Sequence, residues 1–351
     1  MEPIKEALTF DDVLLLPQFS SIVPANTNIN VDLSDTINLK LPFISSAMDT
    51  VTESKMAIAM AKSGGIGIIH RNLEIKKQCA EIQKVKKFRL KVGAAIGTSQ
   101  TELLRAKHLI DAGTDMIVID TAHGHSNNVL KTLSKIKKFS KRITICVGNI
   151  ATGDAAKLLY NSGADILKVG IGPGSICTTR MVAGIGVPQI TALLNVKKTM
   201  QKKKIKIISD GGIKFSGDII KAIAAGADAI MMGSIFAGTD ESPGKILKVK
   251  NKLYKLYRGM GSIGAMSSGS SERYFQKNYK DKSKFVPEGV ESRVLYKGKV
   301  SKIIYQLQGG LRSSMGYIGA KRLKEISKKS RFIKITKAGF YESMVHSVEM
   351  I

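Results

Sequence analysis

Short apolar runs alternate with segments of helical periodicity along most of this chain, and this alternation constrains the fold more than any other feature. A short buried run followed by an amphipathic helix is typical of a parallel sheet, because parallel strands need a crossover connection. Helical periodicity is clearest at 53–62, 101–111, 154–161 and 217–225. Eight runs are predicted to be strands: 43–48, 66–69, 92–96, 116–120, 143–147, 166–169, 205–209 and 229–232.

One four-residue pattern precedes three of these runs. A small residue, glycine, one variable residue and aspartate occur in that order at 112–115, 162–165 and 225–228. The glycine suits the left-handed residue that ends a helix, and the repetition indicates one supersecondary unit used many times. Eight strand–helix units in about 200 residues predict an α/β fold, a closed (β/α)₈ barrel. A doubly wound open sheet is the alternative.

Polar residues gather just after the predicted strands, where such a barrel places its active site. They are Asp49, His70, Asp120, Asn149, Asp210, Ser234 and the loop at 170–180. That loop reads Gly-Ile-Gly-Pro-Gly-Ser-Ile-Cys-Thr-Thr-Arg and directly follows a strand. Its glycines allow close backbone approach, and backbone donors with a cation nearby favour the thiolate form of Cys177. We therefore expect Cys177 to be chemically active.

Glycine and serine follow the last two strands in a pattern that suits phosphate. Asp210, Gly211 and Gly212 follow the seventh run, and Gly233 and Ser234 follow the eighth. Barrels often bind phosphate with the loops at these two positions, through backbone amides and hydroxyls. Ser175 would add a third donor, and Asp120, at the end of the fourth strand, could bind a ribose diol.

The net charge of +27, from 55 Lys and Arg against 28 Asp and Glu, raises a nucleic-acid hypothesis. The basic clusters, at 84–91, 202–206, 245–255 and 321–331, are scattered over predicted helices and their ends. No zinc-finger spacing and no Trp occur. We expect a solvated basic surface that favours an anionic substrate, and no nucleic-acid partner.

Apolar runs are too short to cross a bilayer, and no signal-peptide pattern opens the chain. Three cysteines at wide spacing argue against a disulfide framework and for a reducing, cytoplasmic location. Cys146 is predicted to be a buried strand residue.

We expect one catalytic domain over 1–351, with 1–41 packed beneath or along the barrel. The Gly-, Ser- and charge-rich segment 259–290 would be a mobile flap over its mouth, within a C-terminal extension.

With these residues assembled, the chain resembles the inosine-5′-monophosphate (IMP) dehydrogenase family over nearly its whole length. The motifs that carry the resemblance are Leu-Thr-Phe-Asp-Asp-Val at 8–13, Ser-Ser-Ala-Met-Asp-Thr-Val at 45–51, the 170–179 loop, Ser-Asp-Gly-Gly at 209–212, Met-Gly-Ser at 232–234, Tyr-Arg-Gly-Met-Gly-Ser at 257–262 and Arg-Tyr-Phe at 273–275. The resemblance implies oxidation of IMP to XMP with NAD⁺, the committed step toward guanine nucleotides. Cys177 would attack C2 of the purine, and Arg273, with Tyr274 and Thr179 beside it, would activate the water that hydrolyses the covalent intermediate.

The resemblance also implies the remaining site residues. IMP would be bound by Ser46, Met48, Asn149, Ser175, Asp210, Gly212, Gly233, Ser234, Tyr257, Gly259, Met260 and Glu288. NAD⁺ would be bound by Asp120, Thr121, Ala122 and Gly170. Carbonyls of Gly172, Gly174 and Cys177 would coordinate a monovalent cation, K⁺, completed by Glu342, Ser343 and Met344 of a neighbour in a homotetramer or octamer.

The chain departs from the family at 84–91, which continues directly to Val92. Most members carry a paired CBS regulatory module at this point, near 88–92, so we expect regulation through that module to be absent and the catalytic barrel to work without it. GMP reductase, which deaminates GMP with NADPH, shares the barrel and the cysteine loop. Arg273-Tyr274 and Pro287-Glu288-Gly289 favour the dehydrogenase. A basic nucleotide- or RNA-binding protein on a barrel scaffold is the non-enzymatic alternative.

Overall fold

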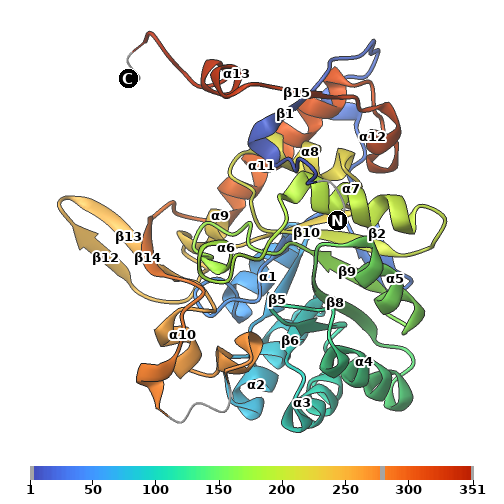
Figure 1. The fold of residues 1–351 in the computed structure, drawn as a ribbon. Helices are drawn as coiled ribbons and strands as arrows, with labels where there is room; N and C mark the ends of the chain where they lie inside the picture. Colours follow the sequence, from blue (N-terminus) through green and yellow to red (C-terminus); the bar gives the residue numbers. More distant parts are fainter. Residues whose placement is uncertain (1–3, 277–280, 349–351) are drawn as a thin grey trace.

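A closed barrel of eight parallel strands forms the centre of the molecule (Figure 1). The computed structural model describes residues 4–276 and 281–348. The barrel strands are β4 (Phe43–Ser45), β5 (Ile66–Ile69), β6 (Val92–Ile96), β7 (Met116–Asp120), β8 (Thr144–Ile150), β9 (Ile166–Val169), β10 (Lys206–Asp210) and β11 (Ala229–Met232). Because β11 pairs with β4, the sheet has no edge, which confirms the (β/α)₈ prediction and excludes the open sheet.

The repeated Gly-x-Asp joints have a common structural role. Gly113, Gly163 and Gly226 all have positive φ, between 92° and 114°, so each ends a helix in the left-handed conformation. The aspartates that follow accept hydrogen bonds from the first amides of the neighbouring strand. Asp165 accepts from Ile145 N at 2.7 Å, and Asp115 and Asp228 accept from Val92 N and Ile207 N, both at 2.9 Å. Each joint therefore fixes the start of one strand beside the next.

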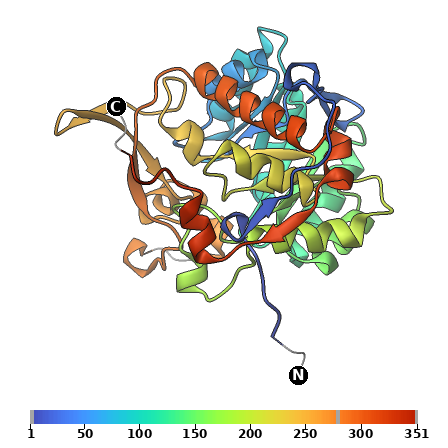
Figure 2. The same cartoon turned by 90° about the horizontal axis from the view of Figure 1, so that it is seen from above.

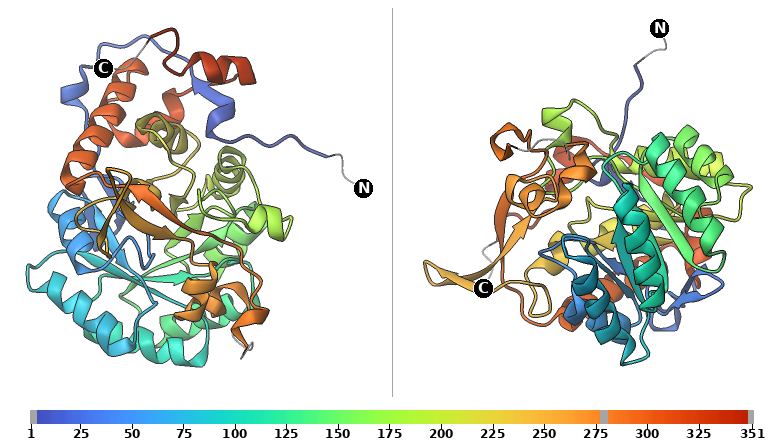
Figure 3. Two further views of the ribbon diagram at one scale, coloured as in Figure 1. Left: turned by 90° about the vertical axis from the view of Figure 1, so that its left-hand side faces the viewer. Right: turned by 90° about the horizontal axis from the view of Figure 1, so that it is seen from below.

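The outer ring of helices covers the barrel on all sides (Figures 2 and 3). Its members are α1 (Ser54–Lys62), α2 (Ile75–Lys86), α3 (Gln100–Asp111), α4 (Asn127–Phe139), α5 (Gly153–Asn161), α7 (Gln189–Met200), α8 (Ser216–Ala224) and α11 (Val300–Tyr317). α11 packs against both α8 and α1, so the helix that closes the ring comes long after the eighth strand. The chain between β11 and α11 forms an excursion over the barrel mouth.

This excursion has a pinched base. Lys297 N donates to Gly238 O at 2.8 Å, and Asp240 N donates to Gly298 O at 3.0 Å, so its two ends lie side by side. Between them are the antiparallel strands β12 (Ile246–Val249), β13 (Lys252–Arg258) and β14 (Glu291–Leu295), which project from the barrel in Figure 1. The short helices α9 (Ser234–Ala237), α10 (Ile263–Ser267), η3 (Ser270–Tyr274) and η4 (Lys282–Lys284) complete it.

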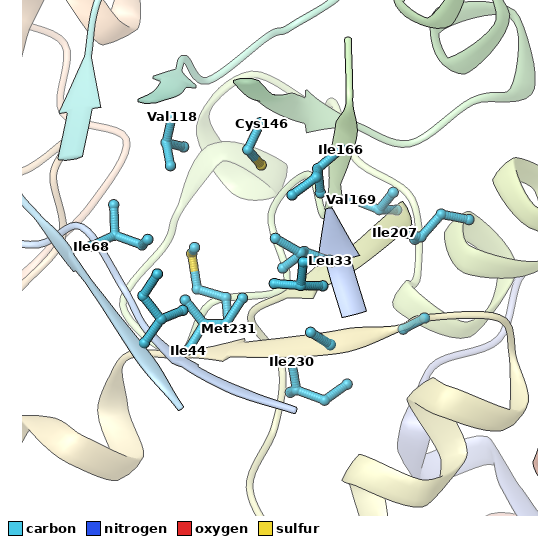
Figure 4. Close-up of a cluster of buried hydrophobic side chains, with 14 of the residues drawn as sticks. Leu33, Ile44, Ile68, Val118, Cys146, Ile166, Val169, Ile207, Ile230 and Met231 are labelled. Carbon is cyan, nitrogen blue, oxygen red and sulfur yellow. The ribbon is translucent and has the colours of Figure 1, made fainter. Parts of the chain in front are cut away.

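A hairpin of β2 (Val31–Ser34) and β3 (Ile37–Leu39) closes the amino-terminal end of the barrel. Ser34 Oγ lies 2.7 Å from Thr144 Oγ1 at the start of β8, and Leu33 is buried with the inward-facing side chains of the barrel (Figure 4). Farther out, β1 (Val13–Leu15) pairs with β15 (Phe332–Lys334) beside α12 (Leu323–Lys329) and α13 (Lys337–Glu342). The expectation that 1–41 packs beneath or along the barrel holds for the hairpin and for the buried residues Phe10 and Val13, whereas residues 4–6 are exposed and the amino-terminal arm extends away from the barrel in Figures 2 and 3.

Two strand ends differ from the prediction by three residues, while the start of β8 and both ends of β10 differ by one. β4 ends at Ser45, so Ser46 to Met48 already belong to the loop at the mouth. β8 runs on to Ile150, so Asn149 lies within the strand rather than after it. Cys146 is fully buried in β8, as predicted, and burial raises the pKa of its thiol to about 12. In the described residues, no helix has the length and apolarity needed to cross a bilayer.

Leu33 offers a test of the barrel floor. Its side chain is 2% exposed, so Leu33→Ala should leave a cavity and lower the free energy of unfolding by about 2–5 kcal/mol. Leu253→Ala, on the exposed side of β13, removes the same atoms from a site that is 42% exposed and should change it by less than about 0.5 kcal/mol. Urea unfolding at equilibrium measures both, and equal values would show that the hairpin does not contribute to the core.

Candidate active site

The carboxyl ends of the barrel strands and the excursion enclose a cavity with about 910 Å³ of space, including its opening to solvent. From the barrel strands and their loops, the lining includes Ser46, Met48, Asp120, Ala122, Asn149, Lys168, Gly170 and Asp210. From the cysteine loop and the excursion it includes Gly172, Gly174, Cys177, Thr179, Gly233, Tyr257, Gly259, Met260, Arg273, Tyr274 and Glu288. The structure therefore brings most of the predicted site residues together.

Cys177 lies at the mouth and not in the core. Its Sγ is half-buried and lies 3.2 Å from Thr179 Oγ1. A strand-like crossing with 288–290 holds the loop, since Thr178 N donates to Glu288 O at 2.9 Å and Val290 N to Ile176 O at 3.0 Å. Arg180, the cation expected beside the thiol, donates to the carbonyls of Ile171 and Val187 and so ties the loop together. Burial lowers the pKa of Arg180, and the charge of Cys177 opposes this.

The predicted phosphate residues converge in part. A Cβ on Gly233 would lie 2.9 Å from Tyr257 Oη and 3.1 Å from Met48 Sδ, so this position needs glycine. Burial raises the pKa of Tyr257, and a hydrogen bond with Ser175 opposes the rise, which places Ser175 beside the ring hydroxyl. Gly212 lies close to Pro173 of the cysteine loop. Ser175, Gly212 and Ser234 are absent from the cavity lining itself, and Ser234 begins α9.

Lys168, which the sequence analysis did not select, lies at the centre of the site. Its side chain is 2% exposed, and its Nζ lies 2.9 Å from both Asp120 Oδ1 and Asp210 Oδ2. It also donates to Asn149 Oδ1, and Asn149 Nδ2 donates to Asp210 Oδ2 at 2.8 Å. A lysine within the apolar strand 166–169 was the available signal, because buried lysines are rare unless paired.

These charges shift one another's pKa values. Burial alone would raise the pKa of Asp120, but Arg273 and Lys168 outweigh it and hold that pKa well below its usual value. Burial alone would lower the pKa of Lys168, but Asp120 and Asp210 raise it. Asp120 and Lys168 are therefore charged near neutral pH, and the cavity holds fixed charges of both signs.

Arg273 and Tyr274 of the excursion are seated on this cluster. Arg273 forms an ion pair with Asp120 Oδ2, and its carbonyl accepts from Ala122 N at 3.2 Å. Burial would lower the pKa of Arg273, but the pair with Asp120 raises it. Tyr274 packs against Gly261, where a Cβ would lie 2.7 Å from the tyrosine ring. Burial raises the pKa of Tyr274, against the opposing charge of Arg273.

Some predicted residues lie elsewhere. Thr121 faces a neighbouring pocket with Thr98 and Ser99. Glu342, at the end of α13, and Ser343 and Met344 after it are exposed and do not line the cavity of their own chain. Asp49 pairs with Arg258 at 2.7 Å, and His70 lies 3.3 Å from Glu53, so both strand-end residues have structural partners.

Comparison with known proteins agrees with this geometry. Residues 7–346 match the IMP dehydrogenase / GMP reductase domain. The chain belongs to this family. Its relatives include proteins named inosine-5′-monophosphate dehydrogenase from Cryptosporidium parvum, 48% identical over 99% of this chain and 97% of the relative, and from Borreliella burgdorferi, 45% identical over 98% of each.

A third relative of the same name, from Aquifex aeolicus, is 40% identical over 99% of this chain and 96% of its own length. That alignment spans 476 positions, whereas the one with the Cryptosporidium protein spans 391. The Aquifex relative therefore carries residues without a counterpart in this 351-residue chain. Relatives of this chain thus differ in length.

The charge cluster predicts a stability change for Lys168→Met. The substitution keeps much of the side-chain volume but leaves Asp210 and part of Asp120 without a buried cation. Breaking a buried ion pair costs about 3–5 kcal/mol, and because Arg273 still pairs with Asp120 we expect about 3 kcal/mol. Lys135→Met on the exposed face of α4 is the matched control and should be nearly neutral. Urea unfolding at neutral pH measures both.

The same cluster sets a pH window for stability. Folding lowers the pKa of Asp120. Its contribution to the free energy of unfolding is therefore present above the pKa of the unfolded chain, about 3.9, and is lost as the pH falls below that value. The pKa of Lys168 is raised, so its contribution is present below about 10.4 and is lost at higher pH. Unfolding measured from pH 3 to 11 should show both losses in the parent protein and a weaker alkaline loss in Lys168→Met. Identical pH profiles would contradict the assignment.

Proposed function

We propose that this protein oxidises IMP to XMP with NAD⁺. One observation carries the proposal: the Cys177 thiol lies at the barrel mouth, in one cavity with the Lys168–Asp210 pair and with Gly233 and Tyr257 of the predicted phosphate residues, in a family whose curated relatives are named IMP dehydrogenase. The product would enter guanine nucleotide synthesis. The cytoplasm, with its reducing conditions, suits a reactive free thiol.

The described cavity offers a separate group for each part of IMP. Ser175, Gly212, Gly233, Ser234 and Tyr257 would surround the phosphate, with amides and hydroxyls as donors. The Asp210 carboxylate, held by Lys168 and Asn149, would accept hydrogen bonds from the ribose hydroxyls. Ser46, Met48, Gly259, Met260 and Glu288 would contact the sugar and the base. This arrangement would direct C2 of the purine toward Cys177.

The chemical steps follow from this placement. The Cys177 thiolate would add to C2 of hypoxanthine, and a hydride would leave C2, so that the purine stays bound to sulfur as a thioimidate. Water would then add to C2 and expel the thiolate, which regenerates the enzyme. Covalent catalysis divides one difficult oxidation into two easier steps. Thr179, 3.2 Å from Cys177 Sγ, can exchange a hydrogen bond with the sulfur.

The donor set at one side of the cavity fits NAD⁺. Asp120 presents a buried carboxylate that would accept from the nicotinamide ribose, beside Thr121, Ala122 and Gly170. When bound, NAD⁺ would supply the acceptor for the hydride. In the present arrangement Arg273 pairs with this carboxylate, so the segment carrying Arg273 and a ribose diol compete for one group. This competition supports the proposal that 259–290 acts as a mobile flap.

Arg273 and Tyr274 would act in hydrolysis. Both line the cavity with Cys177, and the Arg273 guanidinium lies 6.0 Å from the centre of the Tyr274 ring. The resemblance assigns proton acceptance from water to Arg273. Its raised pKa disfavours the neutral form while Asp120 is its partner. Proton acceptance therefore requires a state in which Arg273 has separated from Asp120, whereas the paired cation can orient a water molecule.

The cysteine loop also fits a monovalent cation such as K⁺ in part. Carbonyl oxygens of Gly172, Gly174 and Cys177 are hard donors of the kind that such an ion prefers. In the described residues this loop supplies only half of a coordination shell. Glu342, Ser343 and Met344 are exposed and do not line the cavity of their own chain, which is consistent with donation to a neighbouring copy. We therefore propose a homotetramer, or an octamer built from it, with a cation site shared between subunits.

A steady-state assay separates this function from GMP reduction. NADH formation from IMP and NAD⁺ is expected. Consumption of NADPH with GMP, and no reaction with IMP, would reassign the protein to the other branch of its family.

Cys177→Ala should lower turnover at least about a thousandfold, because the covalent route is lost. IMP should still raise the thermal unfolding temperature of this variant, since the binding groups remain. Cys79→Ala on α2, outside the described cavity, is the control and should keep turnover. Full activity in Cys177→Ala would exclude this residue as the nucleophile.

Arg273→Ala should separate the two chemical steps. Rapid mixing should show a burst of NADH at a rate close to that of the parent protein, followed by slow turnover as the covalent intermediate accumulates. Loss of general-base or water-orienting help typically costs about 10²–10⁴-fold. Mass spectrometry of the stopped reaction should find a purine adduct on the peptide with Cys177. An equal loss of burst and turnover would place Arg273 outside the hydrolytic step.

A further inference from the structure

Glu272, the residue before Arg273, reaches across the barrel mouth to a loop more than 170 residues earlier in the chain. Its Oε1 accepts from Thr98 N at 2.9 Å and from Ser99 N at 2.7 Å, and its Oε2 lies 3.2 Å from Ser99 Oγ. These donors belong to the loop that enters α3 after β6. A 3₁₀-helix of the excursion is thereby attached to the scaffold through one carboxylate.

The receiving loop is shaped and charged for this carboxylate. A Cβ on Gly97 would lie 2.9 Å from Glu272 Oε1 and 2.6 Å from Arg71 Nη1, so a larger residue would displace the carboxylate. Arg71 is buried, its Nη1 lies 3.7 Å from Glu272 Oε2, and its buried Nη2 has no hydrogen-bond partner in the described residues. The amino-terminal end of α3 adds positive potential. A neutral side chain would not be held equally well here.

Two consecutive residues thus attach the same helix to two neighbouring loops. Glu272 is bound by the loop after β6, while Arg273 pairs with Asp120 at the end of β7 and accepts from Ala122 N. Both contacts lie in η3, a helix of only 5 residues. The contact of Glu272 with the barrel therefore constrains where the Arg273 guanidinium can lie. Thr121, Glu272 and Ser99 also line one small pocket beside the main cavity.

We propose that Glu272 is a positioning residue that seats the excursion on the barrel mouth and thereby places Arg273 for the hydrolytic step. The inference rests on the proposed function, because it assigns Glu272 to the second half of that reaction only. Hydride transfer, which uses Cys177 and the bound nucleotides, does not use Arg273 and so does not need the Glu272 contact. Hydrolysis does, since Arg273 and Tyr274 line the cavity in the seated form.

The first test compares Glu272→Gln with Asp281→Asn. Both replace a carboxylate by an amide in 259–290, but Asp281 is exposed and accepts only from Ser283 among the hydrogen bonds of the described residues. In Glu272→Gln the NADH burst rate should stay within about twofold, and steady-state turnover should fall about tenfold, equivalent to about 1.4 kcal/mol. Asp281→Asn should match the parent protein in both. An equal fall of burst and turnover in Glu272→Gln, or unchanged turnover, would overturn the proposal.

The second test does not depend on activity. Backbone hydrogen exchange, read by mass spectrometry on peptides spanning 97–100 and 263–276, should be faster in Glu272→Gln than in the parent protein and in Asp281→Asn. Glutamine keeps one accepting oxygen for the amides of Thr98 and Ser99 but lacks the negative charge that Arg71 and the amino-terminal end of α3 favour, so these hydrogen bonds and the attachment of the excursion weaken. Unchanged exchange would overturn the proposal even if turnover fell. Faster exchange in a protein that does not oxidise IMP would keep the attachment and reject the proposed function instead.

Discussion

A buried ammonium group between two carboxylates organises the mouth of this barrel. Lys168 binds Asp120 and Asp210, which the proposed reaction assigns to the cofactor and the substrate sides of the cavity. Transferring these charged groups from water into the protein interior costs free energy. The ion pairs of Lys168 with the two carboxylates and the hydrogen bonds of Asn149 offset this cost. Because Lys168 comes from the centre of β9, the two carboxylates are set relative to the rigid sheet and not to a loop. The cysteine loop begins directly after the same strand, so the nucleophile and both anchoring groups share one reference point.

The excursion adds a second layer of control over these charges. Asp120 is shared between Lys168 of the barrel and Arg273 of the excursion, and under the proposed function only the second pairing is exchanged. A group that satisfies Asp120 in place of Arg273 would leave the inner pair intact, so exchange at the mouth need not disturb the core. The Glu272 carboxylate attaches the same helix, η3, to the neighbouring loop of the barrel, the one between β6 and α3. The groups proposed for hydrolysis thus come from the excursion, whereas Cys177 follows a strand of the barrel.

Local patterns made the scaffold predictable, while long-range pairings were not. Each barrel strand was visible as an apolar run, and the Gly-x-Asp joints fixed the start of three strands through contacts that depend only on neighbouring units. Cys177 was visible because a glycine-rich loop after a strand is unusual. In contrast, the sequence analysis treated Lys168 as an ordinary strand residue and predicted no role for it. The Arg273–Asp120 and Glu272–Ser99 contacts join segments more than 150 residues apart in the chain. No single-sequence pattern reports such pairs. The closing helix α11 was missed for a related reason, because the 67 residues 233–299 separate it from the eighth strand and interrupt the regular alternation of strands and helices.

The pinched base at Gly238 and Gly298 has a consequence for how such a protein can change. Both ends of the excursion leave the ring at one point, so its length is decoupled from barrel closure, and lengthening it adds little entropic cost. The scaffold therefore tolerates a different cap on the same ring. During evolution, a different excursion could therefore change which reagent, water or another, reacts with the purine that Cys177 would bind. The barrel that holds the purine would stay the same.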